Sequence, residues 1–285
     1  MIMDCDYIMD SKSQFYIVRG YWNDKGVLTN KVFQPKVDGD RFNNITNKNY
    51  EKVIENNHIP LKLYDVKKIF CPRKKLKEEY EGLNETIWHN LIKELSKIIP
   101  IDDIGIIGSY LIGFDVKKDV DIVVYGKENC RKLRENVKKL HKNLGTTPIT
   151  KQHIIYQIKK HGRNYSEFNT FDKLLCNKWS SFQVREGILS TVRFVYKENE
   201  IPVNPFSKKI LKEIEIKGKV IDDLGSNFSP RTFIIKTDSG DYTIATYFWI
   251  YQSCVKNGMN VFVKGNLREG NIVTLDEFSH GIKIP

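Results

Sequence analysis

The chain has 285 residues, of which 40% are hydrophobic and 28% are charged, and its formal net charge is +11. Its length favours two or three domains, and its composition is typical of globular proteins, which excludes fibrous and intrinsically disordered classes. No segment approaches the roughly 18 consecutive apolar residues of a membrane span. Because the first residues carry acids where a secretory signal has basic residues, we expect a cytoplasmic protein without a membrane partner.

The positive charge has two interpretations. Lysine and arginine release counterions from a phosphate backbone, so an excess of basic residues is typical of proteins that bind nucleic acid. A composition rich in Lys, Asn and Ile is also produced by an AT-biased genome, which leaves charge alone indecisive. The five cysteines lack metal-ligand spacing, and neither a zinc site nor a disulfide framework is indicated.

The first 80 residues predict a β-rich N-terminal module. The runs QFYIVRGYW and GVLTNKVF are aromatic and β-branched, and the turn residues between them favour a hairpin. The stretch CPRKKLKEEYEG is charged and poor in apolar residues after its proline. It predicts either a solvated helix or a linker, and we place the first domain boundary there.

Residues 83–205 predict an α/β domain. A helix is expected from Asn84, with Pro100 just past its end and with one apolar face formed by Trp88, Leu91, Ile92, Leu95, Ile98 and Ile99. GIIG and VDIVVY are short apolar runs suited to buried strands. An amphipathic helix over 128–144, ending at Gly145, follows them. Two further helices, around 151–160 and 167–179, lead to a strand over ILSTVRFVY.

Residues 209–285 predict an all-β domain. EIKGKVI, RTFIIKT, YTIATYFWIY, NVFVKGNL and NIVTLDEF read as five short strands separated by turn signals, which suits a small OB-like barrel. One aromatic cluster in this region serves either as barrel core or as a stacking platform for single-stranded nucleic acid; it comprises Tyr242, Tyr247, Phe248, Trp249 and Tyr251.

One segment, GSYLIGFDVKKDVDIVV, has a spacing with a chemical explanation. Gly108 and Ser109 follow a strand, where a small residue lets the backbone approach a phosphate and free N–H groups bind the anion. Asp119 and Asp121 alternate along the next strand, so their carboxylates point to the same face. Paired carboxylates hold Mg²⁺ while leaving positions for triphosphate oxygens.

This Gly-Ser, spacer, Asp-x-Asp signature resembles the DNA polymerase beta nucleotidyltransferase superfamily, and the segment up to DIVVYG is similar to a group of archaeal predicted nucleotidyltransferases. FYIVRGYW, RFVY and the run from FSPRTF to VFVKGNL extend the resemblance over most of the chain. The resemblance implies a nucleotidyltransferase core with a mixed sheet, a triphosphate held by Gly108 and Ser109, and a metal held by Asp119 and Asp121.

The superfamily pattern includes a third carboxylate on a later strand. LSTVRFVY carries Ser190, Thr191 and Arg193 where that acid is sought. Glu186, just before this strand, is either an exposed turn residue or a carboxylate that reaches the site. Without a third acid to deprotonate the acceptor, catalysis is expected to be weak or absent.

We therefore expect an enzyme that uses Mg²⁺ or Mn²⁺ to transfer a nucleoside monophosphate from an NTP or dNTP to an acceptor, with RNA or DNA as the leading acceptor. Two alternatives stay open: a non-catalytic nucleic-acid-binding protein on a degenerate scaffold, and nucleotidylation of a protein or small molecule. Lys117 and Lys118 are either solvated loop residues or secondary contacts that neutralise the triphosphate. The basic face of the 128–144 helix is either solvated or bound to nucleic acid, and it comprises Arg131, Lys132, Arg134, Lys138, Lys139 and Lys142.

Overall fold

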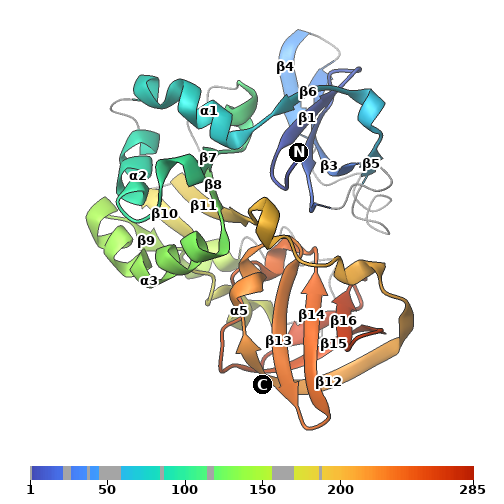
Figure 1. The fold of residues 1–285 in the computed structure, drawn as a ribbon. Coiled ribbons are helices and arrows are strands. Elements are labelled where there is room, and N and C mark those ends of the chain that lie inside the picture. Colours follow the sequence, from blue (N-terminus) through green and yellow to red (C-terminus); the bar gives the residue numbers. More distant parts are fainter. Residues whose placement is uncertain are drawn as a thin grey trace.

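The computed structural model is a mixed α/β protein with three β-sheets (Figure 1). It describes residues 2–21, 27–36, 39–44, 59–83, 87–113, 119–155, 170–185 and 188–285. Within these residues, every helix is too short or too polar to cross a membrane.

The N-terminal sheet has the strand order β4-β3-β2-β1-β6, with β5 paired to β3, and all of its pairings are antiparallel. A tight turn joins its first two strands because the Asp10 carboxylate accepts the N–H groups of Lys12 (2.9 Å) and Gln14 (2.8 Å). The strands are β1 (Tyr7–Asp10), β2 (Phe15–Val18), β3 (Val27–Lys36), β4 (Gly39–Asn44), β5 (Ile59–Leu61) and β6 (Val66–Phe70).

Two helices link this sheet to the next one. The charged stretch after Cys71 is helix α1 (Pro72–Glu79), with proline in the first turn, where its missing N–H has no helical partner to lose. Helix α2 (Ile87–Ser96) follows; its expected N-cap, Asn84, lies outside the described residues. The apolar face is confirmed, since Trp88, Leu91, Ile92, Leu95 and Ile99 are buried.

The central sheet is mixed, with the order β7-β8-β11-β10-β9. The β8–β11 pair is parallel and the other pairs are antiparallel. Its strands are β7 (Ile104–Ile106), β8 (Asp119–Tyr125), β9 (Thr147–Pro148), β10 (Ser181–Arg185) and β11 (Ile188–Val195). Helix α3 (Lys127–Leu144) follows β8 and ends, as expected, at Gly145 in the left-handed conformation (φ 62°).

Further helical structure precedes β10. Residues 151–155 are helical, and helix α5 (Phe171–Leu175) is shorter than the expected helix over 167–179, part of which lies outside the described residues.

The C-terminal sheet closes on itself. Its long strand β12 (Ile210–Asp222) pairs with both β13 (Arg231–Thr237) and β15 (Asn260–Arg268), so the path β12-β13-β14-β16-β15 returns to β12. The five expected strands are present, completed by β14 (Gly240–Thr246) and β16 (Ile272–Leu275). A sixth, β17 (Gly281–Lys283), pairs with β15 and was not predicted. The strand expected over YTIATYFWIY ends at Thr246, and a short 3-10 helix over Trp249–Tyr251 follows.

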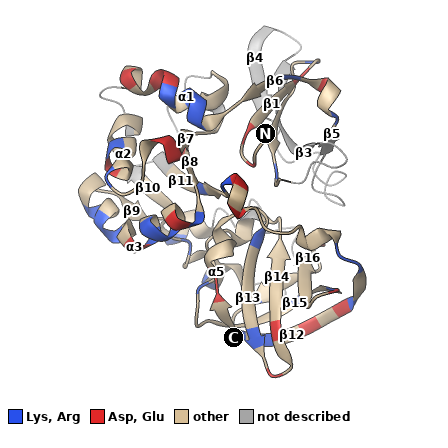
Figure 2. Cartoon of the chain, in the orientation of Figure 1, with Lys and Arg blue, Asp and Glu red and all other residues tan. Residues whose placement is uncertain are grey.

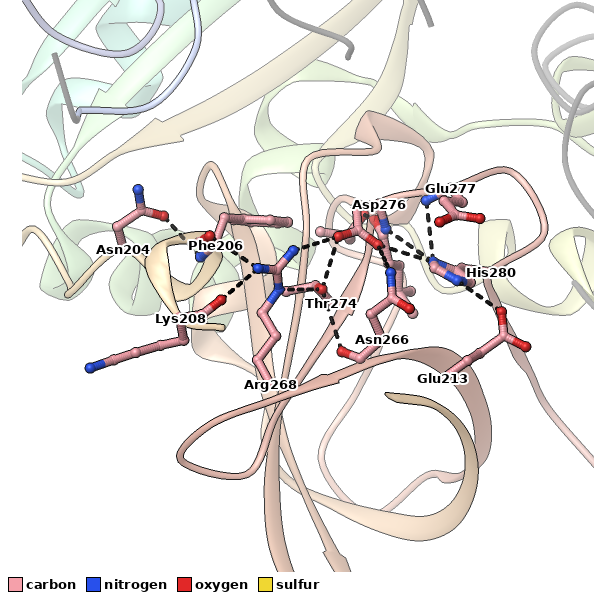
Figure 3. A network of polar contacts seen from close by, with 12 residues as sticks. Asn204, Phe206, Lys208, Glu213, Asn266, Arg268, Thr274, Asp276, Glu277 and His280 are labelled. Carbon is pink, nitrogen blue, oxygen red and sulfur yellow. Dashed lines mark hydrogen bonds and ion pairs between the residues drawn. The ribbon is translucent and has the colours of Figure 1, made fainter. Parts of the chain in front are cut away.

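A polar network fixes the end of this sheet where β15 and β16 meet the preceding loop (Figure 3). Arg268 donates to Asp276 (Nη2 to Oδ2, 2.7 Å), to Thr274 (Nε to Oγ1, 2.8 Å) and to the carbonyl of Lys208 (2.7 Å). His280, which is fully buried, accepts from the backbone N–H groups of Asp276 and Glu277 through Nδ1.

One hydrophobic core joins part of the N-terminal sheet to the central sheet and reaches the segment before β13, while the C-terminal sheet has a core of its own. Buried residues from the N-terminal sheet region, including Tyr7 and Tyr21, join α2 and the central sheet in the same cluster as Phe228, which precedes β13. The rings of Tyr196 and Phe228 stack with centroids 4.2 Å apart, and the backbone N–H of Tyr196 donates to the Tyr21 hydroxyl (2.9 Å). The region just after β11 is therefore held by residues from both neighbouring units.

Candidate active site

Gly108 lies in the turn between β7 and β8 and faces Asp121. Its φ is +79°, a conformation that strains any residue with a Cβ. The turn is tied to β8, since the N–H of Ile107 donates to the carbonyl of Asp121 (3.1 Å). A Cβ added to Gly108 would lie 3.0 Å from Oδ2 of Asp121. Glycine is required here for two reasons, backbone conformation and the space taken by this carboxylate.

The two aspartates occupy alternate positions of one strand. Asp119 begins β8 and lies opposite Leu189 of β11, while Asp121 lies opposite Thr191. Alternation along a strand places both positions on one face of the sheet. The side chains of Asp119 and Ser109 lie outside the described residues; the backbone of Ser109 begins the 3-10 helix Ser109–Ile112. The structure thus brings Gly108 and Asp121 together and places Ser109 and Asp119 beside them in the chain.

Strand β11, which was expected to supply a third acid, has a threonine beside Asp121 instead. Thr191 lies next to Asp121 in the parallel register, and its hydroxyl is 3.3 Å from that of Ser181. Glu186 falls outside the described residues. Within the described part of the chain, no group of three His, Cys, Asp or Glu side chains is arranged to hold a metal ion.

Arg193 is a neighbour of Asp121 that the sequence analysis did not assign to the site. It is two positions beyond Thr191 on β11, and therefore on the same face of the sheet. Burial works to lower the pKa of the Arg193 guanidinium, but the nearby Cys5, Asp121 and Tyr7 groups outweigh burial and raise it. Burial raises the pKa of Tyr7 to about 12, with Arg193 opposing and Asp121 adding to that rise. In the sequence, the one feature that could have drawn attention to Arg193 is its position as a single arginine within a largely apolar strand.

The basic residues considered for phosphate contacts fall into two groups. Lys117 and Lys118 lie outside the described residues. On α3, Arg131 pairs with Glu128, and Arg134 makes a bidentate ion pair with Asp223. The remaining basic residues of that face are exposed along the helix, which Figure 2 shows as a series of blue segments; they are Lys132, Lys138, Lys139 and Lys142.

The aromatic cluster of the C-terminal sheet is divided between core and surface. Phe248 and Tyr251 are 5% and 1% exposed and belong to the core of that sheet, so they are unavailable for stacking on bases. Tyr247 is half-buried and stacks on Phe206 with centroids 4.8 Å apart. The side chain of Trp249 is not described. The interpretation as core is therefore correct for Phe248 and Tyr251.

Comparisons with known proteins give one distant relative. The chain is 26% identical over 181 residues to the uncharacterized protein MJ1086 of Methanocaldococcus jannaschii, a match that covers 60% of this chain. The chain spans about half of that relative's length, 52%. No family model matches the chain. No solved structure matches it either.

Proposed function

We propose that the chain is a metal-dependent nucleotidyltransferase that moves a nucleoside monophosphate from an NTP or dNTP to an acceptor. The observation that carries this proposal is the pairing of the Gly108 turn with the Asp121 carboxylate on a mixed sheet. A turn of this kind exposes backbone N–H groups to a phosphate, and a carboxylate directly beside it is positioned to hold a cation on the same phosphate. A glycine that served only to form a turn would have no need of a carboxylate beside it.

The proposed function requires one divalent cation at the two aspartates. Asp119 and Asp121 would hold Mg²⁺ or Mn²⁺, and phosphate oxygens and water would complete its coordination, as is usual for Mg²⁺ at nucleotide sites. The bound ion would neutralise charge on the reacting phosphate. For their part, Gly108 and Ser109 would fix the triphosphate through the backbone, and Thr191 would offer a hydroxyl beside Asp121. The described residues do not supply the third acid of a two-metal site.

A nucleic-acid acceptor is supported by charge and by the closed C-terminal sheet. The net charge is +11, and the exposed lysines of α3 offer contacts for a phosphate backbone. We propose that the C-terminal ring is an OB-like domain, a fold that binds single strands through its strands and loops. Phe248 and Tyr251 are buried, so only other aromatic residues of the C-terminal sheet could stack on bases. The positive charge is therefore the stronger support for a nucleic-acid acceptor.

A second candidate is a non-catalytic protein that keeps the same scaffold to bind phosphate or nucleic acid. It is favoured by Thr191 and Arg193, which occupy the face where a third carboxylate was sought. A guanidinium near Asp121 competes with a metal ion for that carboxylate. Nucleotidylation of a protein or small molecule is a third version of the same chemistry.

The test incubates the protein with each labelled NTP, Mg²⁺ or Mn²⁺, and a mixed RNA pool. Label on RNA supports nucleic-acid transfer, label on protein supports the third version, and label on neither supports the scaffold. Asp121→Asn keeps the size of the side chain and removes its charge, so transfer should fall at least ~10²-fold. The matched control is Asp102→Asn, an exposed aspartate before β7, which should transfer like the wild type. Equal transfer by Asp121→Asn and wild type would remove Asp121 from the site.

A further inference from the structure

A group of arginines, one buried and two partly exposed, lies where the three sheets meet. Arg193 comes from β11, Arg231 begins β13, and Arg19 directly follows β2. These strands belong to the central, C-terminal and N-terminal sheets, which Figure 1 shows arranged around a common centre. Electrostatic interactions link the three guanidinium groups, although their positions are remote in sequence.

Hydrogen bonds tie the three segments together. Arg231 donates to the Tyr247 carbonyl (3.1 Å) and approaches Oε1 of Gln252 (3.5 Å), while Gln252 donates to the carbonyl of Val192 (3.1 Å), the residue before Arg193. Near Arg19, the N–H of Gly20 donates to Oδ1 of Asp4 (2.8 Å). The backbone around each arginine is thus fixed.

Among the described residues, two carboxylates interact electrostatically with the three arginines. Burial lowers the pKa of Arg19, and Arg193 lowers it further; burial lowers the pKa of Arg231 to about 10, with Arg19 adding to the effect. The carboxylates that offset these charges are Asp4 and Asp121. Cys5 is no counterion at neutral pH, because burial raises the pKa of its thiol far above the usual value.

Lys178 is a further cation close to Arg193 and Arg231. It is buried, and burial lowers the pKa of its ammonium group to about 8, with Arg193 and Arg231 also lowering it. Gathering like charges in a poorly solvated place is costly unless an anion joins them.

Two donors in this group have no partner. The Nε atoms of Arg193 and Arg231 are buried and lack a hydrogen bond, and Arg231 as a whole is only 4% exposed. Buried guanidinium donors in proteins are nearly always satisfied, and unpaired ones indicate a missing acceptor. Arg19 and Arg193 are partly exposed, which leaves their side chains accessible to a ligand.

We propose that Arg193, with Arg19 and Arg231, forms an anion site that takes the distal phosphates of a nucleoside triphosphate bound at Asp121. Planar guanidinium groups match phosphate in geometry and charge, and a polyphosphate brings the negative charge that the group lacks. Arg193 shares its sheet face with Thr191, the neighbour of Asp121, so one ligand reaches both places. The inference rests on the proposed function, because the nucleotide at Asp121 places the polyphosphate here.

The test is calorimetric titration of the full chain with inorganic tripolyphosphate in the absence of divalent cation. Arg193→Gln should weaken binding about tenfold or more, and Arg193→Lys should restore part of the loss. Lys74→Gln on α1 is the control, since it removes one positive charge from a side chain that is 76% exposed and lies outside this group. Melting curves check that each variant folds. If Arg193→Gln does not fold, Arg19→Gln takes its place in the titration.

The outcomes separate the inference from the proposed function. Equal tripolyphosphate affinity in wild type and in the arginine variants, or no binding by wild type, overturns the inference. It is also overturned if Arg193→Gln weakens binding of a 12-residue oligonucleotide but not of tripolyphosphate, because the group would then serve a nucleic-acid backbone. Arginine-dependent tripolyphosphate binding by a protein that transfers no nucleotide would uphold the anion site and reject the enzyme.

Discussion

Arg134 and Asp223 form a two-pronged ion pair, with Nη1 to Oδ1 at 2.7 Å and Nη2 to Oδ2 at 2.6 Å. The pair joins helix α3 of the central unit to the loop after β12. Asp223 also accepts the N–H of Asn257 (2.9 Å), and its side chain is 8% exposed. The sequence analysis assigned Arg134 to a solvated or nucleic-acid-binding face. In the structure, it links the central α/β region to the C-terminal sheet.

The ion pair should show a measurable coupling energy. Because parallel charge-assisted bonds to a buried carboxylate are among the stronger polar contacts, a double-mutant cycle with Arg134→Ala and Asp223→Ala should give about 1–2 kcal/mol. The control is Arg131 with Glu128, an exposed pair on the same helix, whose coupling should stay below about 0.5 kcal/mol. Urea denaturation measures both cycles, and additive effects at Arg134 and Asp223 would contradict the expectation.

Gly108→Ala should abolish nucleotide binding beyond its effect on stability. The left-handed conformation costs alanine about 1–2 kcal/mol, and the new methyl group would meet the Asp121 carboxylate at 3.0 Å. Gly113→Ala is the matched control, since Gly113 also has a positive φ (+93°) but nothing within 4 Å of an added Cβ.

Melting curves with and without NTP and Mg²⁺ compare these two glycine variants. Both should melt lower than wild type, but the nucleotide-induced shift should vanish only in Gly108→Ala, because a ligand that binds the native state raises its stability. A full shift in Gly108→Ala would place nucleotide binding elsewhere.

Asp276 should stabilise the C-terminal sheet in a pH-dependent way. Burial by itself would raise the pKa of this carboxyl, but the close contact with His280 and the hydrogen bonds from Arg268 and Thr274 lower it to about 2. Since the folded pKa lies below the unfolded one, the stabilisation is present above about pH 4 and is lost as pH falls towards 2. Asp276→Asn should remove about 1–2 kcal/mol at pH 7, since the carboxyl is only partly buried and solvent screens its contacts. The exposed Asp241→Asn should change stability little, and equal losses in both variants would contradict the role of the network.

Asp6 should have the opposite pH dependence. Burial raises the pKa of its carboxyl to about 7, partly offset by the N–H of Met3, which donates to Oδ2 (2.9 Å). Between about pH 4 and 7 the unfolded chain loses this proton while the folded chain keeps it, so stability falls as pH rises through that window. Asp6→Asn carries no titrating proton and should flatten that part of the profile, by on the order of 3 kcal/mol across the window. Parallel profiles for wild type and variant, measured by urea denaturation from pH 4 to 8, would refute this assignment.

The local elements could be predicted because short-range patterns encode them. The apolar period of α2, the glycine that ends α3 and the alternation of β8 each depend on neighbours within a few residues. The Gly108 turn and Asp121 belong to adjacent antiparallel strands, so their proximity also follows from local chain geometry. Strand β17 was missed because three residues are too few to show a pattern, and its pairing with β15 defines it.

Long-range packing decided the rest. Tyr251 ends a 3-10 helix and Phe248 lies just before it, and both are buried in the core, although their sequence reads as a continuation of β14. Arg193, Arg19 and Arg231 show no spacing that a sequence pattern could reveal, because three separate sheets bring them together. The sequence determined the strands, helices and the glycine–aspartate turn through local backbone preferences. Only tertiary packing decided that these three arginines lie close together in a poorly solvated region. Their electrostatic interaction depends on distance in space and not on distance along the chain.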